Sequence, residues 1–250
     1  MQTLDRSIIG ITDTIKVPWT GLQQLITPGP GHLVTVLGAT GVGKSSFALL
    51  WELALEEPSI YLSLDSDLAT QAARVASSLS GIPFDDVRKN VAAWQEFLLT
   101  RQRTLPMMID APVLAKDVSQ VVESFEEFYS IKPELVVIDN LKDVVEADTY
   151  EAHRAAVREL HRVAKRYGTT LLVLHHINRS SLAGEGTRPP SIRDGQFTGE
   201  QDSEFMLGLW QSDFLGQTML NIRVLKNRFG PHGMDVQLQF DQSRMRLYDF

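Results

Sequence analysis

Residues 38–46 contain glycine, lysine and serine at a spacing that suits phosphate binding. The segment GATGVGKS fits the pattern G-x-x-x-x-G-K-[ST]. Its glycines let the backbone curl so that successive N–H groups point at phosphate oxygens, while the lysine reaches the β- and γ-phosphates. We therefore expect a phosphate-binding loop with these contact residues: Gly38, Ala39, Thr40, Gly41, Val42, Gly43, Lys44, Ser45 and Ser46.

The segments on both sides of this loop agree with that interpretation. Residues 33–37 (LVTVL) form a β-rich run before the loop, and residues 45–57 have helical composition after it. A phosphate-binding loop needs this order, because the helix that follows adds the positive end of its dipole. The alternative is a glycine-rich turn with an accidental lysine, which would need neither neighbour.

A nucleotide site of this kind also needs a carboxylate, which helps the serine hydroxyl to hold Mg²⁺. Asp139 ends the continuous apolar run of residues 134–140, which is typical of a buried strand. We predict Ser45 and Asp139 as the metal ligands. Asp110, at the end of the shorter run 106–110, is the alternative for the carboxylate role.

Runs typical of strands alternate with runs typical of helices along most of the chain. From Glu204 onward the sequence is β-rich. This order predicts one α/β domain over residues 1–250, a three-layer sandwich whose mostly parallel sheet is extended by C-terminal antiparallel strands. The expected strands before Glu204 are 33–37, 59–65, 106–110, 134–140 and 169–176, and the expected helices are 45–57, 68–82, 115–131 and 149–168.

Composition and charge narrow the class of protein. With 43% hydrophobic and 22% charged residues, the 250-residue chain has a globular composition. No apolar run is long enough for a transmembrane helix, no secretory signal begins the sequence, and cysteine is absent, so we expect a cytoplasmic protein without membrane contact or disulfides. The net charge of −7 argues against a protein that coats DNA nonspecifically, although a local basic lining remains compatible with it.

Several motifs in order resemble the RecA-like ATPase domain of the DnaB-type replicative helicases. The resemblance spans almost the whole chain, and it starts so near the beginning that we expect a stand-alone domain without the family's N-terminal domain. It is carried by the lead-in 17–46, the segment 62–88, the strand VVIDNL, the segment LLVLHHINRS at 171–180, the stretch 192–209, the K-x-R-x-G element at 226–230 and the final QFDQSRMRLYDF.

The resemblance implies a function for the chain. It implies an ATP-dependent DNA helicase or translocase that hydrolyses ATP at subunit interfaces, with ATP and Mg²⁺ as cofactors. The expected partners are single-stranded DNA, further copies in a homo-oligomer that we expect to be a hexamer, and loader or primase proteins. The expected location is a bacterial cell or a phage-infected host.

The resemblance also implies the catalytic residues, which are Lys44, Asp65, Asp139, His176, Lys226 and Arg228. Two of them depart from the family. Asp65 replaces the family's catalytic glutamate and is one methylene shorter, which puts its role as the base in doubt and makes Asp67 the next candidate. His176 stands where the family usually has glutamine, while the neighbouring His175 is expected only to pack at a strand end.

Lys226 and Arg228 lie two residues apart in the β-rich part of the chain. On a strand this spacing points both cations to the same side. In the resembling family the two cations reach a neighbouring subunit's γ-phosphate, with the arginine as a finger. Without the resemblance, a solvated strand face explains the same pair.

Residues 178–200 are rich in glycine, serine and proline and carry several arginines. The resemblance implies a mobile loop that holds the backbone phosphates of single-stranded DNA, whereas the alternative is a plain surface loop. The DNA-binding residues would be Arg179, Arg188, Arg193 and Gly195.

Two other functions compete with the helicase interpretation. One is a RecA- or KaiC-like recombination or mediator ATPase that assembles on DNA without unwinding it. The other, ranked lower, is a metal-dependent DNA nuclease, in which the carboxylates at strand ends and the pair His175–His176 hold two metal ions.

Overall fold

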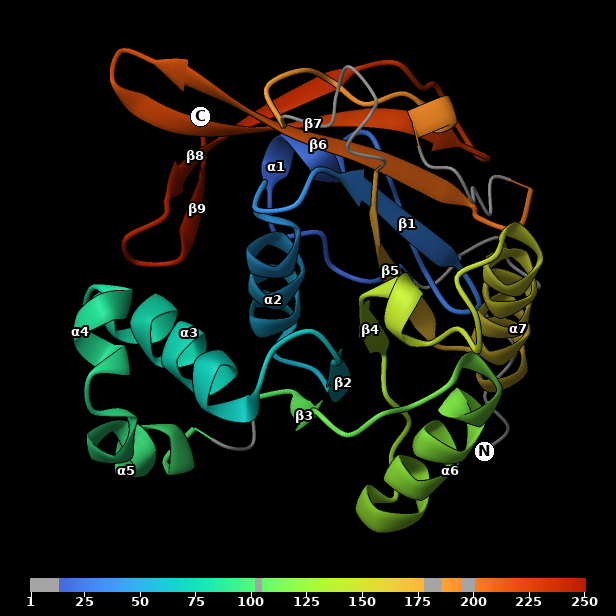
Figure 1. The fold of residues 1–250 in the computed structure, drawn as a ribbon, viewed down its shortest axis with the longest axis horizontal. Helices are drawn as coiled ribbons and strands as arrows, with labels where there is room; N and C mark the ends of the chain where they lie inside the picture. Colours follow the sequence, from blue (N-terminus) through green and yellow to red (C-terminus); the bar gives the residue numbers. More distant parts are fainter. Residues whose placement is uncertain (1–13, 102–104, 178–185, 195–200) are drawn as a thin grey trace, which may run out of the picture.

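The computed structural model describes residues 14–101, 105–177, 186–194 and 201–250, and they are built around one sheet (Figure 1). Its strand order is β3-β2-β4-β5-β1-β6-β7-β8-β9. The first six strands in this order, from β3 across to β6, pair in parallel. The strands β7, β8 and β9 continue the sheet in antiparallel pairs. The strands are β1 (Leu33–Gly38), β2 (Ser59–Ser63), β3 (Met107–Ile109), β4 (Leu135–Asp139), β5 (Thr170–His176), β6 (Phe205–Phe214), β7 (Gln217–Asn227), β8 (Asp235–Asp241) and β9 (Arg246–Asp249).

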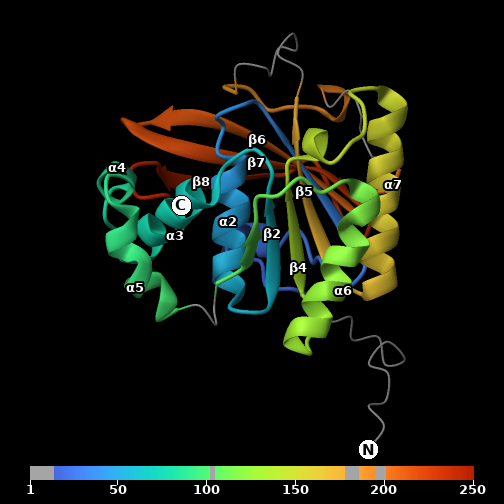
Figure 2. The same ribbon diagram turned by 60° about the horizontal axis from the view of Figure 1, so that its bottom comes forward.

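Helices cover both faces of the parallel part of the sheet (Figures 1 and 2). The helix α2 covers one face, with α3, α4 and α5 beside it, while α6 and α7 cover the other face. The helices are α1 (Thr20–Gln23), α2 (Lys44–Leu55), α3 (Leu68–Ser80), α4 (Phe84–Arg88), α5 (Gln95–Leu99), α6 (Val118–Tyr129) and α7 (Tyr150–Tyr167), with short 3-10 turns η2 (Val91–Trp94), η4 (Ala115–Asp117), η5 (Leu141–Asp143) and η6 (Ile192–Asp194).

The apolar strands alternate between two hydrophobic cores. In β4, Leu135 and Val137 pack on the side of α2, while Val136 and Ile138 pack with α6 and α7. Successive side chains of a strand point to opposite faces, so a strand covered on both faces reads as a continuous apolar run. This packing confirms the predicted three-layer α/β fold with its antiparallel C-terminal extension.

The segment 84–101 differs from the expectation, because the sequence analysis assigned no element to it. It forms α4, η2 and α5, whose apolar side chains pack on α3. Each of these helices is too short to show a helical period, and therefore only the contact with α3 reveals them.

The last two strands fold back toward α3. Arg246 of β9 donates to the carbonyl oxygen of Ser78 at 2.7 Å, and Arg244 donates to that of Gly81 at 2.9 Å. This contact brings the β8–β9 turn to the same edge of the sheet as the end of β1. Within the described ranges, no helix has the length and apolarity needed to cross a membrane.

Candidate nucleotide-binding site

The loop between β1 and α2 has the backbone shape that its glycines predict. Gly41 has φ 79° and Gly43 has φ 103°, values that only glycine adopts easily. A Cβ atom at Gly43 would also lie 2.9 Å from the ring of Phe240. The loop therefore curls tightly over the end of β1 and leads directly into α2, which begins at Lys44.

Lys44 lies folded over this loop. Its Nζ donates to the carbonyl oxygens of Gly38 and Ala39, at 2.9 and 2.8 Å, and lies 3.0 Å from His176 Nδ1. Burial lowers the pKa of Lys44 to about 8, and the nearby Asp139 and Asp65 offset only part of this effect. A buried ammonium group held mainly by neutral partners is suited to receive an anion such as a phosphate.

Asp139 lies beside Ser45, as predicted for the metal ligands. It is buried at the end of β4, where it hydrogen-bonds with the Ser45 hydroxyl and accepts from the Tyr61 hydroxyl at 2.8 Å. Burial raises the pKa of Asp139, and the bonds from Ser45 and Tyr61 oppose that shift. A hydroxyl and a carboxylate in contact supply the oxygen ligands that Mg²⁺ prefers, so these residues fit the ion.

Asp110, the alternative carboxylate, has a different role in the structure. Its Oδ2 accepts a hydrogen bond of 3.3 Å from the backbone N–H of Leu68, at the start of α3. It therefore contacts the end of a helix, whereas Asp139 contacts the phosphate-binding loop.

A pocket of about 410 Å³ opens over the loop. It brings together three of the predicted catalytic residues, Lys44, Asp65 and His176, with the loop itself. Its lining residues are Thr40, Gly41, Gly43, Lys44, Ser45, Ser46, Asp65, Ser66, Arg74, His176, Phe240, Gln242 and Met245.

Arg74 is a lining residue to which the sequence analysis gave no role. Its Nη1 atom is buried and has no hydrogen-bond partner among the described residues. Its charge also lowers the pKa of Asp139. A buried guanidinium N–H without an acceptor, at the wall of a pocket, fits an anionic ligand, which would supply that acceptor.

The β8–β9 turn supplies the outer wall of the pocket, and the sequence analysis missed it as well. Phe240 contacts the loop at Gly43, and the Ser46 hydroxyl lies 3.7 Å from Met245 Sδ. No motif marks these residues, because they reach the loop only through the folding of β8 and β9 onto α3.

The two carboxylates considered as the catalytic base differ in their surroundings. Asp65 is exposed at the pocket wall, two residues after β2. Asp67 caps the start of α3: it accepts from the backbone N–H of Thr70 at 2.7 Å and from its hydroxyl at 3.1 Å, and these bonds lower its pKa. Asp65 therefore faces the pocket, whereas Asp67 is engaged at the start of α3.

The two histidines at the end of β5 also differ. His176 lines the pocket, with its Nδ1 near Lys44. His175 is buried on the other side of the strand, and its ring centroid lies 6.1 Å from that of His153. Burial lowers the pKa of His175 to about 3, so that residue is a neutral packing group at neutral pH.

Lys226 and Arg228 lie far from the pocket of their own chain. Lys226 Nζ donates to the carbonyl oxygen of Ser203 at 2.7 Å, and Arg228 Nη1 donates to Glu204 Oε1 at 2.9 Å. Ser203 and Glu204 precede β6, which runs parallel to β1 from the start of that strand. The pocket lies past the end of β1, about 16 Å further along at roughly 3.3 Å per residue.

The described part of the predicted DNA-binding stretch, residues 186–194, packs beside the pocket. The Gln211 N–H donates to the Gly186 carbonyl oxygen at 2.7 Å, and Ile192 packs on the cluster of Leu37, Ala39, Ile177 and Met206. Arg188 and Arg193 are exposed on this segment. Arg179 and Gly195 lie outside the described residues.

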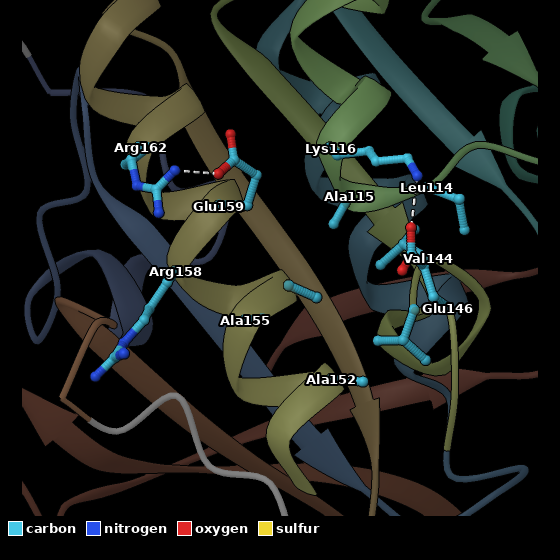
Figure 3. Close-up of a pocket in the computed structure, with 12 residues that line it drawn as sticks. Leu114, Ala115, Lys116, Val144, Glu146, Ala152, Ala155, Arg158, Glu159 and Arg162 are labelled. Atoms are coloured by element: carbon cyan, nitrogen blue, oxygen red, sulfur yellow. Dashed lines mark hydrogen bonds and ion pairs between the residues drawn. The ribbon is translucent and has the colours of Figure 1, made fainter. Parts of the chain in front are cut away.

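A second cavity, of about 400 Å³, lies between α7, the turn η4 and residues 144–146, which follow η5 (Figure 3). Alanine and valine side chains form much of its lining, and the ion pairs Lys116–Glu146 and Arg162–Glu159 stand at its rim. It contains none of the predicted site residues. In the part of the chain that the structure describes, no group of three or more histidine or acidic side chains is arranged to hold a metal ion.

Comparison with known proteins identifies the family to which the chain belongs. The AAA domain family matches residues 15–181, about two thirds of the chain, and the chain belongs to this family. It is a RecA-like AAA ATPase domain; the sequence analysis predicted the RecA-like ATPase domain, and the AAA family comes from this match. The Gene 65 protein of Mycobacterium phage L5 is 28% identical over 253 residues, which cover 95% of this chain and 94% of that protein.

Solved structures share the fold at low sequence identity. A DnaB-like replicative helicase matches 98% of this chain with a TM-score of 0.82 and 16% identity, although this chain spans only 64% of that protein. A separately solved ATPase domain matches 98% of this chain and 95% of its own length, with a TM-score of 0.79 and 16% identity. The RadB recombinase gives a TM-score of 0.62 over 94% of this chain and 99% of its own length, at 16% identity. These likenesses establish the fold, and they agree with the predicted resemblance to DnaB-type ATPase domains.

Proposed function

We propose that this protein is an ATP-driven DNA translocase or helicase of the DnaB-like type, which works as a homo-oligomeric ring, expected to be a hexamer. One observation carries the proposal. The pocket lies past the end of β1, whereas Lys226 and Arg228 lie near the start of the same strand. The two cations cannot serve the pocket of their own chain, and this supports the proposal that they complete the pocket of a neighbour.

In this proposal each residue of the pocket has a separate role. The loop N–H groups and Lys44 hold the triphosphate, and Asp65 orients the attacking water. Ser45 and Asp139 would hold Mg²⁺, which neutralises charge on the phosphate oxygens when bound. His176 donates to the γ-phosphate once Lys44 turns toward the nucleotide, and Arg74 supplies a further N–H donor to the anion.

The DNA would lie along residues 186–194 and the neighbouring stretch. Exposed Arg188 and Arg193 would contact backbone phosphates, as a motor that ignores sequence requires. Gly186 lies against Ala39 and Val42 of the phosphate-binding loop: a Cβ atom added at Gly186 would lie 3.3 Å from the Ala39 side chain and 3.7 Å from that of Val42. This contact gives a direct path by which nucleotide and DNA can influence each other. Loader or primase proteins remain expected partners of such a ring.

The experiment mixes two inactive variants. Lys44→Ala removes the pocket but leaves Arg228, and Arg228→Ala does the reverse, so each homo-oligomer should hydrolyse ATP very slowly. At equal mixing about one quarter of the interfaces join an intact pocket to an intact arginine, and ATPase activity should return to about that fraction of wild type. Failure to recover would contradict the shared site.

A control mixture and a DNA assay complete the test. Lys44→Ala mixed with Arg74→Ala should not recover, because both changes damage the pocket itself. Wild-type protein should separate a forked DNA duplex with ATP, and electron microscopy with single-stranded DNA should show closed rings. ATPase activity with open filaments and no strand separation would instead support the recombination or mediator function.

A further inference from the structure

Glu204 is a buried carboxylate that lies outside the nucleotide pocket. It stands directly before β6, and its side chain is only 3% exposed. Its Oε2 accepts from the backbone N–H of Leu33 at 2.9 Å. Its Oε1 accepts from Arg228 at 2.9 Å and lies 3.2 Å from His161 Nε2, on α7.

These contacts fix Arg228 at two points. Besides the guanidinium bond to Oε1, the backbone N–H of Arg228 donates to the Glu204 carbonyl oxygen at 3.0 Å. A buried carboxylate is costly without a cation, so Glu204 keeps the arginine close. The Arg228 side chain is nevertheless 46% exposed. Because a guanidinium has five N–H donors, those that do not face Glu204 remain available on the outer side.

The same short segment also holds the other cation. Lys226 donates to the carbonyl oxygen of Ser203, and the Ser203 hydroxyl lies 2.8 Å from that of Thr35 in β1. The Glu204 N–H in turn donates to the Leu33 carbonyl oxygen at 3.0 Å. Residues 203 and 204 thus join both cations to the strand that leads into the phosphate-binding loop.

We propose that Glu204 is the positioning residue of Arg228, holding its guanidinium in the orientation that reaches the triphosphate of a neighbouring copy. The inference rests on the proposed function and deepens it. An arginine that is already oriented loses little conformational freedom when it meets the phosphate, and it stabilises transition-state charge without rearrangement. Glu204 itself does not touch the nucleotide.

The first test is Glu204→Gln, which keeps the size of the side chain and removes its charge. We expect kcat for ATP to fall about 10- to 100-fold, less than in Arg228→Ala, while binding of a fluorescent ATP analogue to the pocket stays near wild type. The matched control is Asp235→Asn, which breaks the bidentate pair with Arg223 on β7 and should leave the ATPase rate unchanged. A wild-type rate in Glu204→Gln would overturn the proposal.

The second test separates positioning from a general structural role. Glu204→Gln mixed with Lys44→Ala should recover about one quarter of wild-type ATPase, whereas Glu204→Gln mixed with Arg228→Ala should not recover. A structural defect would damage the pocket as well, and then neither mixture would recover. The double variant with Arg228→Ala should be no slower than Arg228→Ala alone, since both changes act through one arginine.

A second variant and the order of the mixtures distinguish the possible failures. If Glu204→Gln does not fold, Glu204→Asp keeps the charge, withdraws the carboxylate by one methylene, and should show a smaller loss of kcat that the same mixture rescues. If Lys44→Ala and Arg228→Ala fail to rescue each other, the shared site itself is wrong. If they succeed and the Glu204 mixture fails, only the role of Glu204 is overturned.

Discussion

The two ends of β1 bury opposite charges. Past its end, the cation Lys44 is buried in the loop, and its pKa falls to about 8. At its start, the anion Glu204 is buried and the cation Arg228 is half exposed. A buried cation with neutral partners attracts an anion inward, whereas a cation held by a buried anion is directed outward. In the proposed oligomer, these two ends are the two halves of one shared site rather than two separate sites.

The largest expected effect is at the start of β1, where Arg228 is directed outward. Arg228→Ala should lower kcat by about 10³ to 10⁵, the range for arginine fingers, while ATP still binds. The matched control is Arg223→Ala, a partly exposed and ion-paired arginine on β7 that should leave kcat near wild type. Steady-state ATPase and nucleotide binding measure both variants, and an active Arg228→Ala would remove the distinction between the two ends.

The second effect concerns Asp65, which lines the pocket past the end of β1. Asp65→Asn should bind ATP normally and lose about 10² to 10⁴ in kcat, the range for a missing general base. Asp65→Glu, which restores the longer side chain, should retain activity. Asp67→Asn is the control, because that carboxylate caps α3. If kcat falls equally in Asp65→Asn and Asp67→Asn, Asp65 is not the specific base.

A smaller effect is expected when Tyr61 loses its hydroxyl. Tyr61→Phe removes the 2.8 Å hydrogen bond to Asp139, and a bond to a charged group is worth about 1.5–3 kcal/mol. We expect the Mg²⁺ concentration for half-maximal ATPase activity to rise by less than about tenfold, because the bond already exists without Mg²⁺ and most of its energy contributes to folding rather than to metal binding. Magnesium titrations at saturating ATP measure it. An unchanged requirement would show that Ser45 alone orients the carboxylate.

The smallest effect is a dependence on pH. Phosphate binding favours the protonated form of Lys44, whose pKa is about 8 without nucleotide. ATP affinity should therefore be constant below that pH and fall as the pH rises through it, by up to about tenfold per unit, with uptake of a proton on binding. Calorimetry between about pH 7 and 9 tests this. Lys44→Arg stays protonated and should give a flat profile.

Local sequence predicted the parts of the site that belong to one loop or one strand end. The spacing of Gly38, Lys44 and Ser45 specifies the loop, and the apolar run before Asp139 specifies a buried strand that ends beside it. Because parallel strands end at one edge, Asp65 and His176 also reach the pocket. These predictions need only the order of the strands.

The residues that sequence reasoning missed depend on tertiary contacts. Arg74 reaches the pocket because α3 packs at one side of it, and Phe240 because β8 and β9 fold over the loop. Glu204 lies in a polar stretch that looks solvent-exposed, and only its contact with α7 and β1 makes it buried. No local sequence pattern indicates which polar residue a helix from a distant part of the chain will bury.

In the proposed shared site, the pocket and Arg228 lie at opposite ends of one strand, and this placement would give any assembly a direction. In such an assembly, the pocket of one copy meets Arg228 of the next copy. A twofold axis would bring two identical surfaces together, so it cannot relate copies that are joined in this way. Each added copy leaves one free pocket at the front and one free Arg228 at the back, so the assembly grows head to tail and either closes into a ring or continues as a helix. In both cases every β1 strand has the same sense around the axis. A DNA strand on that axis would meet a surface whose two directions are not equivalent.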